Sequence, residues 1–129
     1  MPSLQKVLYV EDEPDIQAVA KLALEMVGGL TVRLCSSGQE ALDCAAEFAP
    51  DVLLLDVMMP GMDGPSTLRA MRQRPDLASL PVIFMTAKVQ PDEVASYKAL
   101  GALGVIAKPF DPMKLADEVR RLWAGRAAG

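Results

Sequence analysis

The sequence predicts an α/β fold: a doubly wound, five-stranded parallel sheet with helices on both faces. Three observations support this prediction. Five short apolar runs alternate with five segments of helical spacing, the pattern of right-handed β–α–β crossovers. Residues 52–55 are apolar throughout and lie between Pro50 and Pro60, as in a strand buried on both faces. The chain of 129 residues shows no internal repeat and no linker, so we expect one domain.

Three strands and two helices are expected in the first part of the chain. Their predicted ranges, in order, are residues 6–10, 14–27, 30–35, 37–48 and 52–55. Pro14 suits a first helical turn with Glu13 as its cap, and Gly28–Gly29 ends that helix. Its apolar stripe consists of Ile16, Val19, Ala20, Ala23, Met26 and Val27. Residues 30–35 alternate like an edge strand, and Ser37 with Glu40 resembles a capping box for the next helix.

Three helices and two strands are expected in the second part. Their predicted ranges, in order, are residues 66–72, 81–86, 91–100, 104–108 and 112–123. Pro75 follows the first of these helices, Pro91 begins the second, and Asp111 caps the third. The inward face of that last helix is formed by Leu115, Val119, Leu122 and Trp123. Residues 124–129 have no core pattern, so we expect them to fray.

Composition excludes several classes of function. Hydrophobic residues make up 51% of the chain, enough for a substantial core. The net charge is −4 with no basic run, which argues against nucleic-acid binding. No apolar run approaches the roughly 18 residues of a membrane span, and the N-terminus lacks the layout of a signal peptide. We therefore expect a cytoplasmic protein without membrane or nucleic-acid partners.

Cysteine and histidine usage narrows the chemistry further. Cys35 and Cys44 form no C-x-x-C pair, so we expect reduced thiols that pack in or near the core. The chain contains no histidine. This absence excludes a Ser-His-Asp triad, a His-ligated zinc site and a phosphohistidine carrier.

Polar residues follow four of the predicted strands at the point where each apolar run ends. These residues are Glu11, Asp12, Asp56, Thr86 and Lys108. The carboxyl ends of parallel strands share one edge of the sheet, so we expect these side chains to converge. Two like charges about 4 Å apart repel by roughly 4 kcal/mol at an effective dielectric near 20. The carboxylates therefore need Lys108 and a hard divalent cation, and few protein ligands with room for water favour Mg²⁺.

Each of these polar residues taken alone could be an ordinary solvated strand end. The same explanation is weak for all of them together, because the arrangement would have to recur by chance at four strands. We therefore treat the group as a candidate site, with Asp56 at its centre.

The chain resembles a response-regulator receiver domain over residues 5–123. The resemblance rests on four segments in order: Val10-Glu11-Asp12-Glu13, Leu55-Asp56-Val57-Met58-Met59-Pro60-Gly61-Met62-Asp63-Gly64, Met85-Thr86-Ala87 and Lys108-Pro109-Phe110. The second segment is specific by itself, and the ordered set is more so. The resemblance implies a flavodoxin-like receiver fold with strand order 2-1-3-4-5.

The resemblance also implies a metal site. Asp12 and Asp56 would bind Mg²⁺ directly, together with the backbone carbonyl of Met58. Glu11 would join directly or through water. Two aspartates are common where this chain has Glu11-Asp12, so the longer Glu11 is a mild departure from the family pattern.

The resemblance gives the remaining site residues roles in phosphoryl transfer. Asp56 would accept the phosphoryl group, since a carboxylate can act as a covalent nucleophile. Thr86 would bond one phosphoryl oxygen and Lys108 would pair with another, which neutralises the equatorial charge. The peptide bond between Lys108 and Pro109 would be cis.

The implied function is that of a phosphorelay response regulator in a two-component system. The donor would be a sensor histidine kinase or a histidine phosphotransfer protein, and an unknown downstream protein would read the altered surface. We expect residues 1–129 to form one receiver domain with no output domain. Enzyme activity is not expected beyond self-phosphorylation from small donors and self-dephosphorylation. A degenerate receiver that only docks partners is the alternative.

One departure concerns the switch. Receivers usually carry an aromatic residue three positions before the lysine, and this chain has Val105 there. Tyr97 or Phe110 could substitute, although simple packing is the more economical explanation for both.

Two enzyme classes fit the sequence less well. A phosphatase of the haloacid-dehalogenase type would need a second acid at the position of Met58 and a cap domain. A dinucleotide-binding enzyme would need G-x-G-x-x-G after the first strand, which is absent.

Overall fold

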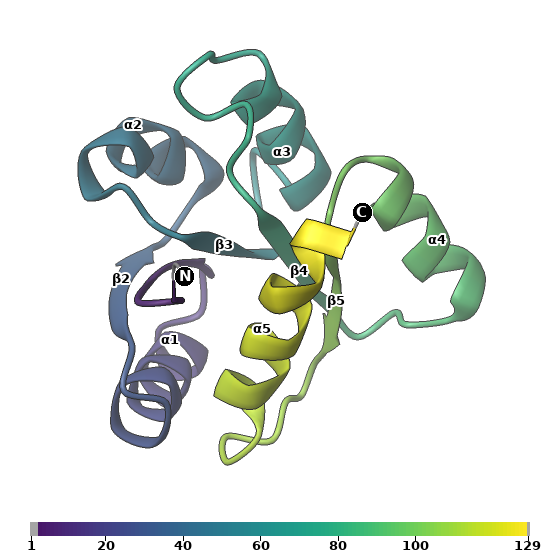
Figure 1. Cartoon of the computed structure of the whole chain (residues 1–129). Coiled ribbons are helices and arrows are strands. Elements are labelled where there is room, and N and C mark those ends of the chain that lie inside the picture. Colours follow the sequence, from purple (N-terminus) through teal and green to yellow (C-terminus); the bar gives the residue numbers. More distant parts are fainter. Residues whose placement is uncertain (1–2, 129) are drawn as a thin grey trace.

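The computed structural model describes residues 3–128 and contains one five-stranded parallel sheet (Figure 1). The strands are β1 (Lys6–Val10), β2 (Thr31–Cys35), β3 (Val52–Asp56), β4 (Val82–Thr86) and β5 (Gly104–Ala107). Their order in the sheet is β2-β1-β3-β4-β5, and every neighbouring pair is parallel. The structure thus confirms the predicted α/β fold and strand order, including β2 as an edge strand.

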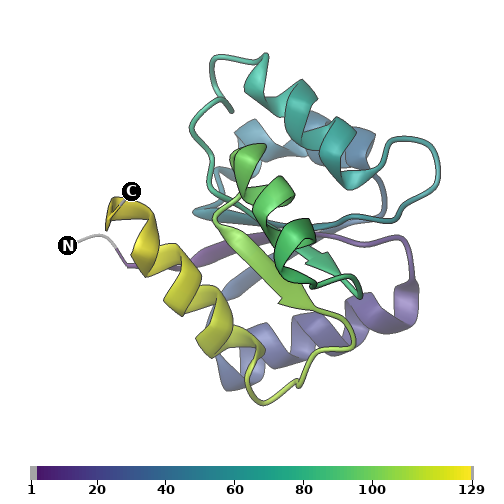
Figure 2. The same cartoon turned by 90° about the vertical axis from the view of Figure 1, so that its right-hand side faces the viewer.

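Helices cover both faces of the sheet (Figure 2). They are α1 (Pro14–Leu22) with the π-helical continuation η1 (Ala23–Val27), α2 (Gly38–Phe48), α3 (Gly64–Arg72), α4 (Pro91–Ala99), α5 (Leu115–Ala124) and the 3₁₀ helix η2 (Gly125–Ala128). α1, η1 and α5 pack on one face, and α2, α3 and α4 pack on the other. Each face therefore encloses its own apolar core.

The central strands β3 and β4 are buried at every position. Because neighbouring side chains alternate between the faces of a strand, Leu54 and Ile83 enter one core while Leu53 and Phe84 enter the other. This double burial fixes the end of β3, where Asp56 lies. Among the described residues no helix is long and apolar enough to span a membrane.

The first helix differs from its predicted stripe. Val19, Met26 and Val27 are 45%, 77% and 48% exposed, whereas Leu24 is fully buried. For Met26 and Val27 the reason is the π-helical turn of η1, whose wider winding rotates these side chains away from the regular α-helical face. Val19 lies before this turn, in the regular part of α1. Glu13 occupies the N-cap position before Pro14, as predicted, but its side chain makes no capping hydrogen bond.

The other helix starts show which capping predictions hold. Ser37 Oγ accepts from the backbone N–H of Glu40 at 3.1 Å, as predicted. The Glu40 carboxylate reaches the N–H of Ser36, one residue before the expected partner. α3 begins two residues earlier than predicted, because Asp63 Oδ1 accepts from the N–H of Ser66 at 2.9 Å.

The C-terminal helix begins at Leu115, three residues later than predicted. Asp111 is not its cap: its side chain accepts from the N–H of Met113, and its carbonyl accepts from the N–H of Leu115. Residues 125–128 form the 3₁₀ helix η2, in which Arg126 lies over the ring of Trp123 at 3.4 Å and donates to its carbonyl. Fraying of the tail stays a prediction. Gly129 lies outside the described part of the chain.

The two cysteines are buried free thiols, as expected, and their sulfur atoms lie 3.2 Å apart. Cys35 closes β2 and Cys44 faces it from α2. Burial, and the neighbouring Cys44, raise the pKa of Cys35 far above its usual range, so this thiol stays protonated.

Candidate functional site

The strand register brings the predicted polar residues to one edge of the sheet. Val10 pairs with Leu55, so Glu11 and Asp56 follow as neighbours. Thr86 pairs with Ala107, so Lys108 lies one residue beyond that pair. The sequence predicted this convergence, and the register produces it.

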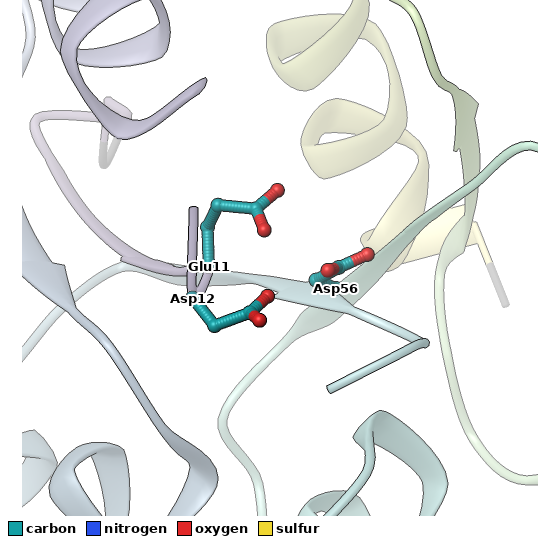
Figure 3. A group of neighbouring side chains, drawn as sticks. All are labelled: Glu11, Asp12 and Asp56. Carbon is teal, nitrogen blue, oxygen red and sulfur yellow. The ribbon is translucent and has the colours of Figure 1, made fainter. Parts of the chain in front are cut away.

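Three carboxylates form a compact acidic cluster. Each of Glu11, Asp12 and Asp56 offers a carboxylate oxygen, and these oxygens lie within 4.8 Å of one another. Figure 3 shows the side chains reaching from the end of β1 and the end of β3 toward a common space. Glu11 is fully buried, Asp56 is 3% exposed and Asp12 is half-buried. A set of three hard oxygen donors with one partly open side suits a cation such as Mg²⁺.

Lys108 neutralises part of this cluster. Its Nζ donates to Glu11 Oε1 at 2.7 Å and to Asp56 Oδ1 at 3.2 Å. The Lys108 side chain is 18% exposed, so it bridges the buried carboxylates and the surface. One cation serves two buried anions, and the cluster therefore keeps an excess of negative charge.

This imbalance appears in the pKa values. Burial, and the charge of Glu11, raise the pKa of Asp56 to about 6. Burial also pushes the pKa of Glu11 upward, but the hydrogen bond and charge of Lys108 outweigh it and hold that pKa below its usual range. Burial lowers the pKa of Lys108, but its bond to Glu11 and the nearby carboxylates raise it overall. Glu11 is thus the firmly ionised partner of Lys108, while Asp56 titrates just below neutral pH.

Thr86 and Met58 occupy two further predicted positions. Thr86 is 3% exposed, and its Oγ1 accepts from the N–H of Lys88 at 3.1 Å. Among residues 3–128 this hydroxyl donates to no partner, so its proton is available to a phosphoryl oxygen. The Met58 side chain is 70% exposed, which leaves it clear of the core. The role of its backbone carbonyl as a metal ligand stays a prediction.

The backbone around the cluster is closely packed. The N–H of Glu11 donates to the carbonyl of Cys35 at 3.0 Å, which joins the end of β1 to the edge strand. After β3 the chain folds back so tightly that a Cβ on Gly64 would lie 2.6 Å from the carbonyl oxygen of Asp56. Only glycine fits there. The Lys108–Pro109 peptide bond is cis, as the resemblance implied.

Tyr9 is a residue near the site that the sequence did not single out. Its side chain is fully buried, and its hydroxyl has no hydrogen-bond partner among the described residues. Burial, followed by the charges of Glu11 and Asp56, raises the pKa of Tyr9 well above its usual range. The available signal was spacing: Tyr9 and Glu11 are two residues apart, so their side chains lie on the same side of β1.

The region expected to carry a switch contains Val105 of β5 and Tyr97 of α4. Val105 is half-buried and packs in the core beneath α2, α3 and α4. The ring of Tyr97 in α4 packs on Phe84 of β4, with centroids 5.1 Å apart and planes at 54°. Tyr97 therefore rests two residues from Thr86 along the sheet, on the face where Val105 replaces the usual aromatic residue.

Comparison with known families settles the class of protein. The model of the response regulator receiver domain matches residues 7–120. The chain belongs to this family. Receiver domains act in two-component phosphorelay signalling and are generally phosphoacceptors rather than classical enzymes. Magnesium binding at an acidic pocket is typical of them.

Individual relatives agree with this assignment. The response regulator Rre1 of Synechocystis is 35% identical over 94% of this receiver, and NtrC of Escherichia coli is 42% identical over 81%. This receiver covers 52% of the length of Rre1 and 22% of NtrC, so these relatives contain much more chain.

Solved structures match nearly end to end. The chemotaxis protein CheY4 of Vibrio cholerae has a TM-score of 0.84 at 32% identity, with 93% of this receiver and 99% of that chain covered. The receiver domain of a signal transduction histidine kinase from Syntrophus aciditrophicus has a TM-score of 0.79 at 34% identity, with 97% and 94% covered.

Proposed function

We propose that Asp56 is the phosphoacceptor of this receiver, with a sensor histidine kinase or a histidine phosphotransfer protein as the donor. The single observation that supports this proposal best is the position of Asp56. It is a buried carboxylate at the carboxyl end of β3 that contacts Lys108 and lies beside two further carboxylates. With a pKa of about 6, Asp56 is largely ionised at neutral pH and can act as a nucleophile.

In the proposed reaction an Asp56 oxygen attacks the phosphorus of a phosphohistidine. The new P–O bond forms as the P–N bond breaks, and the electron pair remains with the departing imidazole. Lys108, which already contacts Asp56, pairs with a phosphoryl oxygen. The free hydroxyl proton of Thr86 is donated to another phosphoryl oxygen.

We propose a Mg²⁺ site formed by Asp12, Asp56 and the backbone carbonyl of Met58, with Glu11 as a direct or water-mediated partner. The fit rests on the three carboxylate oxygens within 4.8 Å of one another. Bound Mg²⁺ would neutralise charge on the phosphoryl oxygens during transfer. The acyl phosphate is a mixed anhydride that water can hydrolyse, so we also propose self-dephosphorylation. We further propose self-phosphorylation from small donors.

The output is proposed to be a protein contact. Movement of Thr86 and Lys108 toward the phosphoryl group would shift the loops after β4 and β5 and alter the face formed by α4, β5 and α5. We also propose that residues 1–129 form a single receiver domain. A cytoplasmic location is typical of the family and is proposed here.

The test is incubation with acetyl phosphate, with and without Mg²⁺, followed by intact-mass measurement. Wild type should gain the mass of one phosphoryl group in a Mg²⁺-dependent manner, and Asp56→Asn should gain none. Asp12→Asn should need at least tenfold more Mg²⁺ for the same yield, because it loses a direct ligand. The matched control is Asp15→Asn, which removes an exposed carboxylate of α1 outside the cluster.

Two results would contradict the proposal. An unmodified wild-type protein under all conditions would instead favour a docking role without phosphorylation. An undiminished adduct on Asp56→Asn would place the modification on another residue.

A further inference from the structure

The side-chain amide of Gln17, on α1, ties the ends of β1 and β2 together beside the acidic cluster. Its Nε2 donates to the backbone carbonyl of Glu11 and to Ser36 Oγ at 3.2 Å, with a longer contact of 3.4 Å to the carbonyl of Cys35. An amide nitrogen carries two hydrogens, so Glu11 and Ser36 can each accept one. Gln17 is half-buried and has no role in the reaction proposed above.

Residues 11–13 are the part of the site that the sheet holds least. They follow β1 and precede α1, so they belong to neither a strand nor a helix. The N–H of Glu11 still donates to the carbonyl of Cys35 at 3.0 Å, but no backbone N–H among residues 3–128 donates to the carbonyl of Glu11. The amide of Gln17 supplies a donor in its place.

The carbonyl that Gln17 holds belongs to the peptide unit that joins Glu11 to Asp12. A peptide unit is planar, so a hydrogen bond to its carbonyl also fixes the direction in which the next residue leaves the chain. Asp12 is the least buried carboxylate of the cluster, and its oxygen lies within 4.8 Å of those of Glu11 and Asp56. The bond from Gln17 therefore bears on where the Asp12 carboxylate points.

The contact on the β2 side is itself well anchored. The N–H of Ser36 donates to Glu40 Oε2 at 3.0 Å, and Ser37 Oγ accepts from the N–H of Glu40 at 3.1 Å. These bonds fix the start of α2. Gln17 thus connects residues 11–13 to a rigid helix start, and it is a firm support for the Glu11–Asp12 peptide.

We propose that Gln17 is a positioning residue of the metal site: its amide holds the Glu11–Asp12 peptide in the orientation that turns the Asp12 carboxylate toward Asp56. The inference rests on the Mg²⁺ site proposed above, and Gln17 acts through the backbone rather than as a ligand. Without this bond the peptide unit can rotate and turn Asp12 away from the cluster. Binding a cation must then restore the orientation, which lowers the affinity.

The test is Gln17→Met, which keeps the length of the side chain and removes its N–H donors. Isothermal titration calorimetry of the full chain with MgCl₂ measures the dissociation constant. We expect this constant to rise about tenfold, the lower end of the loss seen when a group that orients metal ligands is removed.

Phosphorylation by acetyl phosphate gives a second measurement on the same variant. The Mg²⁺ concentration for the half-maximal rate should rise by a similar factor. The rate at saturating Mg²⁺ should stay within about twofold of wild type, because Asp56, Thr86 and Lys108 are unchanged. A defect that Mg²⁺ overcomes is the mark of a residue that positions a metal ligand.

Two variants serve as controls. Gln39→Met removes an exposed glutamine amide that donates to Asp43 within α2, and it should leave the Mg²⁺ dissociation constant unchanged. Ser36→Ala removes one acceptor of the Gln17 amide but keeps the bond to Glu11, and it should have a much smaller effect than Gln17→Met.

Urea midpoints with and without Mg²⁺ separate positioning from simple support of the fold. Mg²⁺ raises the midpoint of a protein that binds it in the folded state, and weaker binding reduces this rise. We expect a smaller Mg²⁺-induced rise in Gln17→Met than in wild type or Gln39→Met.

Three outcomes would overturn the inference. An unchanged Mg²⁺ dissociation constant in Gln17→Met would show that the amide does not act on the site. Urea midpoints that fall equally with and without Mg²⁺ would show that the amide only supports the fold. If wild type itself binds no Mg²⁺, the proposed metal site fails and this inference fails with it, a result distinct from a defect confined to Gln17→Met.

Discussion

The acidic cluster and helix α4 differ in how firmly the fold holds them. Glu11 follows β1 and Asp56 ends β3, both strands are flanked on both sides in the sheet, and both side chains are almost completely buried. α4 has no buried residue along its length, and the ring of Tyr97 contacts Phe84 in a tilted arrangement. The acidic cluster is therefore part of the buried core, whereas α4 packs on the surface of the core.

This difference suits the two tasks of a receiver. Phosphoryl transfer requires fixed geometry, which burial and the close approach at Gly64 provide. A surface that changes shape must have a low free energy of rearrangement, so it has few buried contacts. The acidic cluster carries an electrostatic cost, because the buried carboxylates of Glu11 and Asp56 share the one positive charge of Lys108.

The largest expected effect comes from removing that cation. Lys108→Met should lower the free energy of unfolding at pH 7 by roughly 3–5 kcal/mol, because it leaves the buried charge of Glu11 unpaired. Urea denaturation measures the loss. Lys88→Met, which removes an exposed lysine nearby, should stay within about 0.5 kcal/mol of wild type. If both variants were equally stable, the cluster would not depend on Lys108.

The next largest effect is the loss of stability that accompanies ionisation of Asp56. Its pKa rises from 3.8 to about 6 on folding, so the folded state binds the proton more tightly than the unfolded chain. Wild type should therefore lose stability relative to Asp56→Asn as the pH rises from about 4 to about 6, by roughly 2–3 kcal/mol.

Paired urea titrations of wild type and Asp56→Asn between pH 3.5 and 7.5, without Mg²⁺, measure this difference. The stability gap should be absent below the lower pKa and complete above the upper one. A gap that grew toward acid pH would reverse the sign and show that Asp56 is stabilised in its ionised form.

The smallest effect is expected at α4. Tyr97→Ala removes an aromatic pair and should cost about 1 kcal/mol of stability. Hydrogen exchange should show that the amides of α4 exchange faster than in wild type, while those of β3 are unchanged. Lys98→Ala, an exposed change on the same helix, is the control and should leave both unaffected. Uniform acceleration across the sheet would mean that α4 is not a separate, weakly held unit.

Most of the candidate site followed from the sequence for a geometric reason. Parallel strands end at one edge, so the polar residues after four apolar runs had to meet there, and Asp56 was fixed by a run bounded by prolines. The pairing of Lys108 with Glu11 was less accessible, because it depends on side-chain length and rotamer rather than on position. Tyr9 was missed because its hydroxyl is hidden in an ordinary apolar strand pattern.

The errors at helix ends have a common physical origin. The stripe of the first helix assumed 3.6 residues per turn, and the wider turn of η1 broke that period so that Leu24 is buried while Met26 is exposed. At the last helix, Asp111 bonds within a preceding turn instead of capping. In both cases the pattern of local hydrogen bonds determined the conformation. The same residue pattern is compatible with more than one such pattern of hydrogen bonds, so the sequence alone did not predict the outcome.

The bond from Lys108 to Glu11 spans 97 positions of the chain. During synthesis, β1 and β3 leave the ribosome long before Lys108, so the nascent sheet contains Glu11 and Asp56 without their cation. Burying both carboxylates at that stage would be unfavourable, so we expect chains that end before Lys108 to form no stable partial domain. We therefore expect Lys108 to stabilise the sheet only once nearly the whole chain has been made.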